Sequence, residues 1–211
     1  MNAIEIIKAR LPNGNKAKAE LIYDQDATNP REGDNLGTIL IAPSKSHWIA
    51  GRDDIVDTSI PFGNNPCEDW ENLRREQLNL KKSDIAVAYP ITLHEHGEIS
   101  LSLGYKSGCE RGVIGFIYVT KEQVRKCYGV KRITKSILES AENCLQSELD
   151  TLTAWLNGDC YGWKLEEYTL TDDLDWKEVD TLDACWGYFD KEQALDDMQN
   201  MLKLLTATKT L

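Results

Sequence analysis

The feature that most constrains the fold is a stripe of apolar side chains at helical spacing between residues 134 and 156. Positions three and four apart in this segment lie on one face of an α-helix, and the polar residues between them face away from it. Asn157 and Gly158 follow the last apolar position, as is common at helix C-termini. We therefore predict one long amphipathic helix, whose apolar stripe consists of Ile137, Leu138, Ala141, Leu145, Leu149, Leu152 and Leu156.

Strands are predicted on both sides of this helix in the sequence. Residues 4–11 and 16–24 flank the dipeptide Asn13-Gly14, which supplies the positive φ values of a two-residue hairpin turn. Other short runs predict strands at residues 38–42, 84–93, 98–103, 112–119, 160–168 and 184–189, the last two joined by an acidic connection. Helices are predicted at 67–80, at 120–129, where Thr120 and Gln123 form a capping box, and at 190–205. The predicted fold class is α+β: a mostly antiparallel sheet with an N-terminal hairpin, one long amphipathic helix and a C-terminal helix.

The composition indicates a globular chain. Of the 211 residues, 41% are hydrophobic and 28% are charged, and no repeat or low-complexity tract interrupts them. We predict a single domain over residues 1–211. The six cysteines show no paired spacing, so free thiols are expected. Because the sequence has neither a membrane-spanning apolar run nor a signal-peptide pattern, we expect no membrane association and a cytoplasmic location.

Charge is unevenly distributed along the chain. The formal net charge is −11, and thirteen acids face two bases, Lys164 and Lys177, between residues 139 and 183. A concentrated field of one sign steers partners of the opposite sign, so these acids predict a continuous acidic face that binds a protein with a basic surface. The candidate partner-binding residues are Glu139, Glu142, Asp150, Asp172, Asp173, Asp175, Glu178 and Asp180. The alternative is a solvated helix face and loop without a binding role.

The segment just before this acidic span is basic. Residues 121–135 contain six bases and one acid, and Tyr128 lies among them as a ring on which a base could stack. A nucleic-acid-binding regulator is therefore one alternative function. The negative charge of the whole chain repels polyanions, however, and local ion pairing with the acidic span is the other interpretation. We do not expect direct nucleic-acid binding.

Residues 24–35 are rich in oxygen ligands of the kind that hard cations prefer. Asp24, Asp26 and Asp34 are the candidate ligands for Ca²⁺ or Mg²⁺, and a small metal-dependent enzyme that uses this loop is a second alternative function. The spacing does not match an EF-hand, and Asp and Asn side chains in such loops commonly bond their own backbone instead. The sequence contains no nucleophile-elbow, zinc or phosphate-loop motif. It therefore favours a non-enzymatic role without a cofactor.

Three stretches resemble a family of accessory proteins of uncharacterised activity from tailed bacteriophages. They are NPREGDNLG at 29–37, GFIYVTKEQVRKCYGVKRIT at 115–134, and the pair NGDCYGW at 157–163 and DACWGYF at 183–189. The resemblance implies phage origin, the cytoplasm of an infected bacterial host and a small accessory role, and it carries over no catalytic residue. Together with the acidic span, it predicts an interaction protein, similar to an anti-restriction or anti-CRISPR protein, that inhibits a host nucleic-acid-handling or defence protein by occluding its surface.

Overall fold

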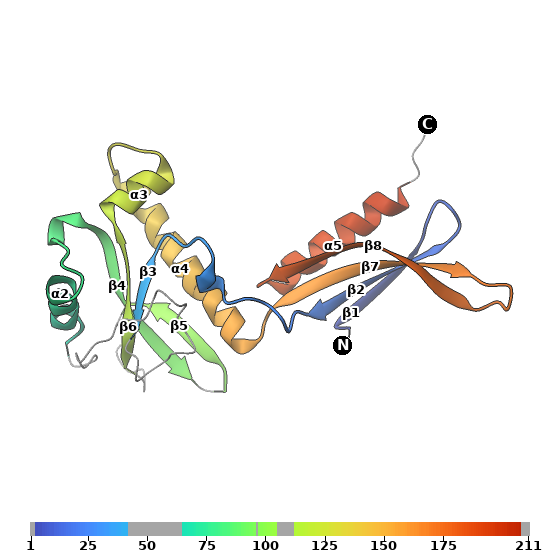
Figure 1. Cartoon of the computed structure of the whole chain (residues 1–211), viewed down its shortest axis with the longest axis horizontal. Helices are drawn as coiled ribbons and strands as arrows, with labels where there is room; N and C mark the ends of the chain where they lie inside the picture. The colour runs from blue at the N-terminus through green and yellow to red at the C-terminus, as the bar shows by residue number, and fades with distance from the viewer. Residues whose placement is uncertain (1–2, 42–64, 96, 105–111, 208–211) are drawn as a thin grey trace. The chain divides into compact units, whose positions relative to one another are not determined.

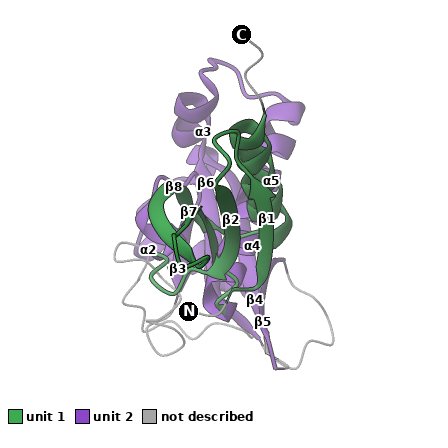
Figure 2. Cartoon of the chain, turned by 90° about the vertical axis from the view of Figure 1, so that its right-hand side faces the viewer, with its two compact units in different colours: residues 1–28, 158–211 green, residues 29–157 purple. Residues whose placement is uncertain are grey.

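The computed structural model describes residues 3–41, 65–95, 97–104 and 112–207 (Figure 1). The chain forms two compact units, which Figure 2 colours separately. Unit 1 consists of residues 1–28 and 158–211, and unit 2 of residues 29–157. The α+β fold class is confirmed, because each unit has its own four-stranded antiparallel sheet and at least one helix. That the two units make up a single domain stays a prediction.

Unit 1 is a sheet with one helix against it. The strands are β1 (Glu5–Arg10), β2 (Lys16–Tyr23), β7 (Tyr161–Leu170) and β8 (Trp176–Tyr188), in the order β1-β2-β7-β8. The predicted C-terminal helix is α5 (Lys191–Thr206), which packs on one face of this sheet (Figure 1). Alternate strand residues such as Ala19, Leu21 and Trp163 point into the core between them. Within the described part of unit 1, no helix covers the opposite face.

The predicted β1–β2 hairpin is confirmed, but its turn is longer than the two-residue turn that Asn13-Gly14 indicated. The amide of Leu11 donates to the carbonyl of Asn15 (2.8 Å), and the amide of Gly14 donates back to Leu11 (3.0 Å). Three residues therefore lie between the closing pair, and among them only Gly14 has a positive φ, of 90°. Glycine adopts this conformation without the steric cost that a Cβ brings.

Unit 2 is a second sheet with helices on both faces. Its order is β3-β6-β4-β5, with β3 (Thr38–Ile41), β4 (Ile85–Glu95), β5 (Ile99–Leu103) and β6 (Val113–Thr120). The predicted long helix is α4 (Lys135–Asn157), and its leucine stripe packs on one face with Leu145 and Leu149 fully buried. Helix α2 (Pro66–Glu76) packs on the other face through Trp70 and Leu73. Strand β6 contacts both layers, which explains why nearly all of its residues are buried.

The local caps of unit 2 agree with the sequence. The Thr120 hydroxyl accepts from the amide of Gln123 (3.2 Å), and the Gln123 side chain accepts from the amide of Thr120 (2.8 Å). This capping box opens α3 (Lys121–Tyr128), which ends at Gly129 with a φ of 63°. Two 3-10 turns, η1 (Pro30–Glu32) and η2 (Lys82–Asp84), precede β3 and β4.

A buried ion pair attaches η1 and the residues after it to α4. Nη1 of Arg31 lies 3.0 Å from the Glu148 carboxylate, and Nη2 donates to the carbonyl of Gly37 (2.7 Å). The same carboxylate accepts the amides of Leu36 (2.6 Å) and Gly37 (3.2 Å). Much of the segment NPREGDNLG therefore has a structural role at the entry to β3.

The prediction of an acidic connection between strands at 160–168 and 184–189 is wrong, because most of the residues between them belong to strands. Strand β7 continues to Leu170 and β8 begins at Trp176, so only residues 171–175 form the turn. Strand β8 is largely exposed over its first half. Without a buried face, that half lacks the alternation of apolar and polar residues by which strands are recognised.

Candidate functional site

The β7–β8 hairpin extends beyond the β1–β2 turn (Figure 1). Strand β2 pairs with β7 only as far as Tyr168, whose partner is Lys16. Strands β7 and β8 stay paired beyond this point, to Leu170 and Trp176. In the described structure the outer part of the hairpin therefore has no further sheet neighbour. We call this outer part, residues 169–177, together with residues 178–180 next to it on β8, the hairpin arm.

The tip of the hairpin arm is closed in the same way as the β1–β2 turn. The amide of Thr171 donates to the carbonyl of Asp175 (2.8 Å), and the amide of Leu174 donates back to Thr171 (3.0 Å). Leu174 thus occupies the position that Gly14 has in the first hairpin, and its φ is 64°. A bulky residue rarely adopts this left-handed conformation, and the side chain is also 76% exposed. Neither backbone geometry nor burial explains a leucine at this position.

Apolar and acidic side chains are exposed together on the hairpin arm. Leu170, Trp176 and Val179 are exposed large hydrophobic residues. Five of the predicted partner-binding acids are exposed on the same arm: Asp172, Asp173, Asp175, Glu178 and Asp180. Lys177 is the one base of the arm, so five acids and one base give it a formal charge of −4. The sequence prediction and the geometry therefore agree that these five acids lie together.

The other three predicted partner-binding acids lie on α4 in unit 2. Glu139 and Asp150 are exposed, whereas Glu142 is half-buried and accepts a hydrogen bond from the Tyr89 hydroxyl (3.0 Å). Burial and this contact with Glu142 raise the pKa of Tyr89. The place of Glu142 outside the leucine stripe suggested that it faces water freely, but its contact with Tyr89 shows that it does not. Because these acids and the hairpin arm belong to different units, a continuous acidic face stays a prediction.

The three candidate cation ligands are divided between the units. Asp24 and Asp26 belong to unit 1, and Asp34 belongs to unit 2. The Asp24 carboxylate accepts the backbone amides of Asp26 (3.2 Å) and Gly187 (3.2 Å), which is the backbone bonding expected as the alternative. Across the residues that the structure describes, no three His, Cys, Asp or Glu side chains are grouped to hold a metal. A cation site at this loop stays a prediction.

An ion-pair network joins β2 and β7 on the face of the unit 1 sheet that α5 does not cover. Nζ of Lys18 lies 2.6 Å from Glu20, and Nζ of Lys164 lies 3.1 Å from Glu20 and 2.5 Å from Glu166. Burial acts to raise the pKa of Glu20, but hydrogen bonds from the two lysines outweigh it and hold this pKa below its usual range. The hydrogen bond to Glu166 raises the pKa of Lys164. With two bases and two acids, the network is neutral.

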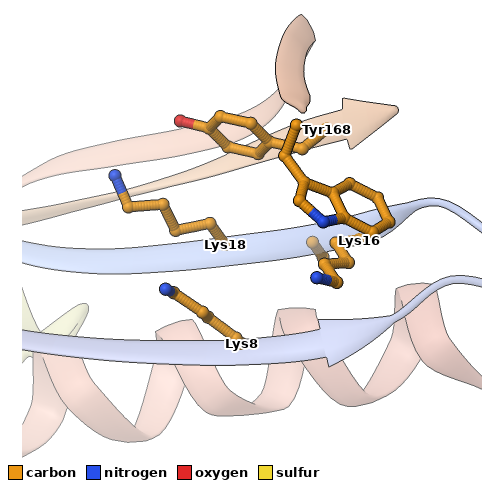
Figure 3. A pocket seen from close by; sticks show the side chains of 6 residues that line it. Lys8, Lys16, Lys18 and Tyr168 are labelled. Atoms are coloured by element: carbon orange, nitrogen blue, oxygen red, sulfur yellow. The ribbon is translucent and has the colours of Figure 1, made fainter. Parts of the chain in front are cut away.

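A hollow of about 280 Å³ lies beside this network (Figure 3). Lys8 of β1, Lys16 and Lys18 of β2, Tyr168 of β7 and Trp176 of β8 line it. Nζ of Lys16 lies 3.6 Å from the centre of the Trp176 ring, and Nζ of Lys18 lies 5.8 Å from that of Tyr168. Both are cation–π distances. An acidic chain thus concentrates three ammonium groups and two aromatic rings at one place.

The basic segment 121–135 is less uniform in structure than in sequence. Its residues Lys121 and Arg125 line a second hollow, in which Asp84 and Glu122 also take part. Two acids balance the two bases there. The hollow therefore does not favour the nucleic-acid-binding alternative.

Sequence reasoning missed Leu174, Lys8 and Lys16 as candidate functional residues. For the lysines the signal was partial: the predicted hairpin puts them on neighbouring strands, but its two-residue turn pairs Lys8 with Ala19, one residue away from the observed Lys8–Lys18 pair. Leu174 has no comparable signal. Its left-handed φ depends on where β7 and β8 pair, and the sequence alone did not reveal that pairing.

Comparison with known proteins identifies no relative of this chain. No protein-family model, no curated protein and no solved structure matches the chain. In the part of the chain that the structure describes, no helix has both the length and the apolar character needed to cross a membrane. Function is therefore inferred from the hairpin arm and the hollow.

Proposed function

We propose that this protein works by binding a partner protein through the hairpin arm rather than by catalysis. The observation that carries the proposal is Leu174, an exposed leucine with a φ of 64° at the tip of a projecting hairpin. The left-handed conformation costs such a residue about 1–2 kcal/mol. Burial within the chain does not offset this cost. A partner that covers Leu174 supplies the missing burial.

The composition of the hairpin arm defines the partner surface that fits it. Interfaces commonly have an apolar centre and a polar rim, and charged groups at the rim set the rate of association. Leu174 fits an apolar pocket, and Asp172, Asp173 and Asp175 beside it fit Lys or Arg side chains around that pocket. The formal charge of −4 on the arm therefore favours a basic partner surface.

A nucleic-acid-handling protein of an infected bacterial host is the class of partner that we propose. Such proteins have basic surfaces that face phosphates, and an acidic arm on one of these surfaces excludes the nucleic acid. The resemblance of residues 29–37 and 115–134 to phage accessory proteins supports this choice and makes a defence protein the leading candidate. Inhibition by occlusion requires no catalytic residue.

The first test separates the role of Leu174 in binding from its role in folding. Leu174→Gly removes the side chain and relieves the left-handed strain, so its free energy of unfolding should equal or exceed that of the wild type by up to about 1 kcal/mol. Capture of host proteins from a bacterial lysate should nevertheless fall. Leu204→Ala is the matched control, because Leu204 is 70% exposed on α5 and has ordinary helical geometry.

The second test addresses the acids. Replacing Asp172, Asp173 and Asp175 by Lys should slow association with the captured protein, and wild-type association should slow steeply with added salt. The control is reversal of two exposed acids on α5, Glu192→Lys with Asp196→Lys. If Leu174→Gly and the triple reversal capture the same proteins as the wild type in the same amounts, the hairpin arm is not the binding element.

A further inference from the structure

Basic side chains face each other across the β1–β2 ladder. Lys8 is the direct partner of Lys18, and Arg10 is the direct partner of Lys16. Directly opposed residues of antiparallel strands have adjacent side chains, and like charges at such positions destabilise the sheet. Neither Lys8, Lys16 nor Arg10 forms an ion pair with another described residue. The sheet therefore holds positive charge that its own carboxylates leave uncompensated.

Lys8 and Lys16 are the uncompensated bases that reach the hollow. The third lysine of the hollow, Lys18, is 2.6 Å from Glu20, and this hydrogen bond raises its pKa. Lys8 and Lys16 therefore leave an excess of two positive charges among the residues that line the hollow. A phosphomonoester carries about two negative charges at neutral pH, whereas a carboxylate carries one, so the phosphomonoester matches this excess better.

The remaining walls of the hollow are aromatic. Tyr168 and Trp176 come from β7 and β8, and Figure 3 shows the Tyr168 ring beside the lysine side chains. Aromatic rings bind nucleobases by stacking, which does not depend on the identity of the base. The volume of about 280 Å³ is close to the lower limit of small-molecule sites. The size suits one nucleotide rather than a longer ligand.

We propose that the hollow binds a nucleoside monophosphate, with the phosphate at Lys8 and Lys16 and the base against the ring of Tyr168 or Trp176. This site shares Trp176 with the hairpin arm but does not include Leu174 at its tip. The phosphate chemistry could come from a free nucleotide or from the 5′-phosphate end of a nucleic-acid strand, and the size of the hollow favours the free nucleotide.

The test is calorimetric titration of the full chain with AMP, inorganic phosphate and adenosine at low salt. AMP should bind at least about tenfold more tightly than either fragment, since it alone offers both the dianion and the ring. Replacing Lys8 and Lys16 together by Gln should weaken AMP binding at least about tenfold. The charge-matched control is Lys191→Gln with Lys203→Gln on α5, which should leave the affinity unchanged.

Two further variants connect the affinity with named parts of the molecule. Trp176→Leu should weaken AMP binding and leave inorganic phosphate binding unchanged, and Leu204→Ala on α5 should alter neither. Far-ultraviolet circular dichroism checks that each variant is folded. The proposal is overturned if AMP does not bind, if the Lys8 and Lys16 variant keeps wild-type affinity, or if phosphate binds as tightly as AMP. Binding of a 5′-phosphorylated oligonucleotide without binding of AMP also overturns it.

Discussion

Replacing Arg31 by Ala leaves a buried carboxylate without its cationic partner. The side chains of Arg31 and Glu148 are only 3% and 11% exposed, and the two are joined at 3.0 Å. Removing one member of such a pair costs about 3–5 kcal/mol, because the charge that remains cannot be solvated. Domains of this kind have a free energy of unfolding of about 5–15 kcal/mol. Arg31→Ala should therefore remove a large share of the stability of unit 2.

The assay is urea unfolding followed by far-ultraviolet circular dichroism and by tryptophan fluorescence. Trp70 and Trp155 lie in described parts of unit 2, and Trp163, Trp176 and Trp186 lie in unit 1, so single-tryptophan variants can report on each unit. If the units unfold separately, only the transition of unit 2 should move. A shared transition should move as a whole.

The control is an ion pair of a base and a carboxylate that are both exposed to solvent. Lys135 and Glu139 on α4 approach to 3.5 Å with side chains 91% and 58% exposed, so Lys135→Ala should cost less than about 0.5 kcal/mol. The double variant Arg31→Met with Glu148→Gln should lose at least about 1 kcal/mol less than the sum of the two single changes, because it removes both buried charges. A loss below about 1 kcal/mol for Arg31→Ala would refute the reasoning.

Three other predictions concern a glycine, an acid and a thiol. A Cβ on Gly115 would overlap the backbone of β3, so Gly115→Ala should lower the free energy of unfolding in urea by about 1–3 kcal/mol. The control is Gly112→Ala, which has open space around it and should change this free energy by less than about 0.5 kcal/mol. Burial acts to raise the pKa of Glu166, but its ion pair lowers this pKa below 4.5. The resulting stabilisation is present above that value and is lost as pH falls through the folded-state pKa. The urea midpoint should therefore drop in acid, and it should drop less for Glu166→Gln. Burial, with nearby carboxylates, raises the pKa of Cys160 to about 11. Peptide-resolved thiol labelling at about pH 8 should therefore modify the exposed Cys67 far sooner than Cys160. Equal labelling rates for the two thiols would contradict this.

The sequence alone determined the elements whose signals lie within a few neighbouring residues. The capping box of Thr120 and Gln123 opens α3, Gly129 ends it, and the leucine stripe becomes the buried face of α4. Each of these depends on hydrogen bonds or spacing along one segment, so no knowledge of distant residues is needed. The clustering of five acids in the hairpin arm was predictable for the same reason, since those residues are neighbours in the chain.

Only the tertiary structure decided which distant segments meet. Strand β2 pairs with β7 from the far end of the chain, and that register places Lys16 opposite Tyr168 and next to Trp176. In the same way Arg31 finds Glu148, although nothing near either residue indicates the other. Strand partners are chosen by the surfaces that they bury together, and similar apolar runs in one sequence offer several such choices. The lysine hollow results from the long-range pairing of β2 with β7, and the left-handed φ of Leu174 results from the register in which β7 and β8 pair. Neither was read from the local sequence.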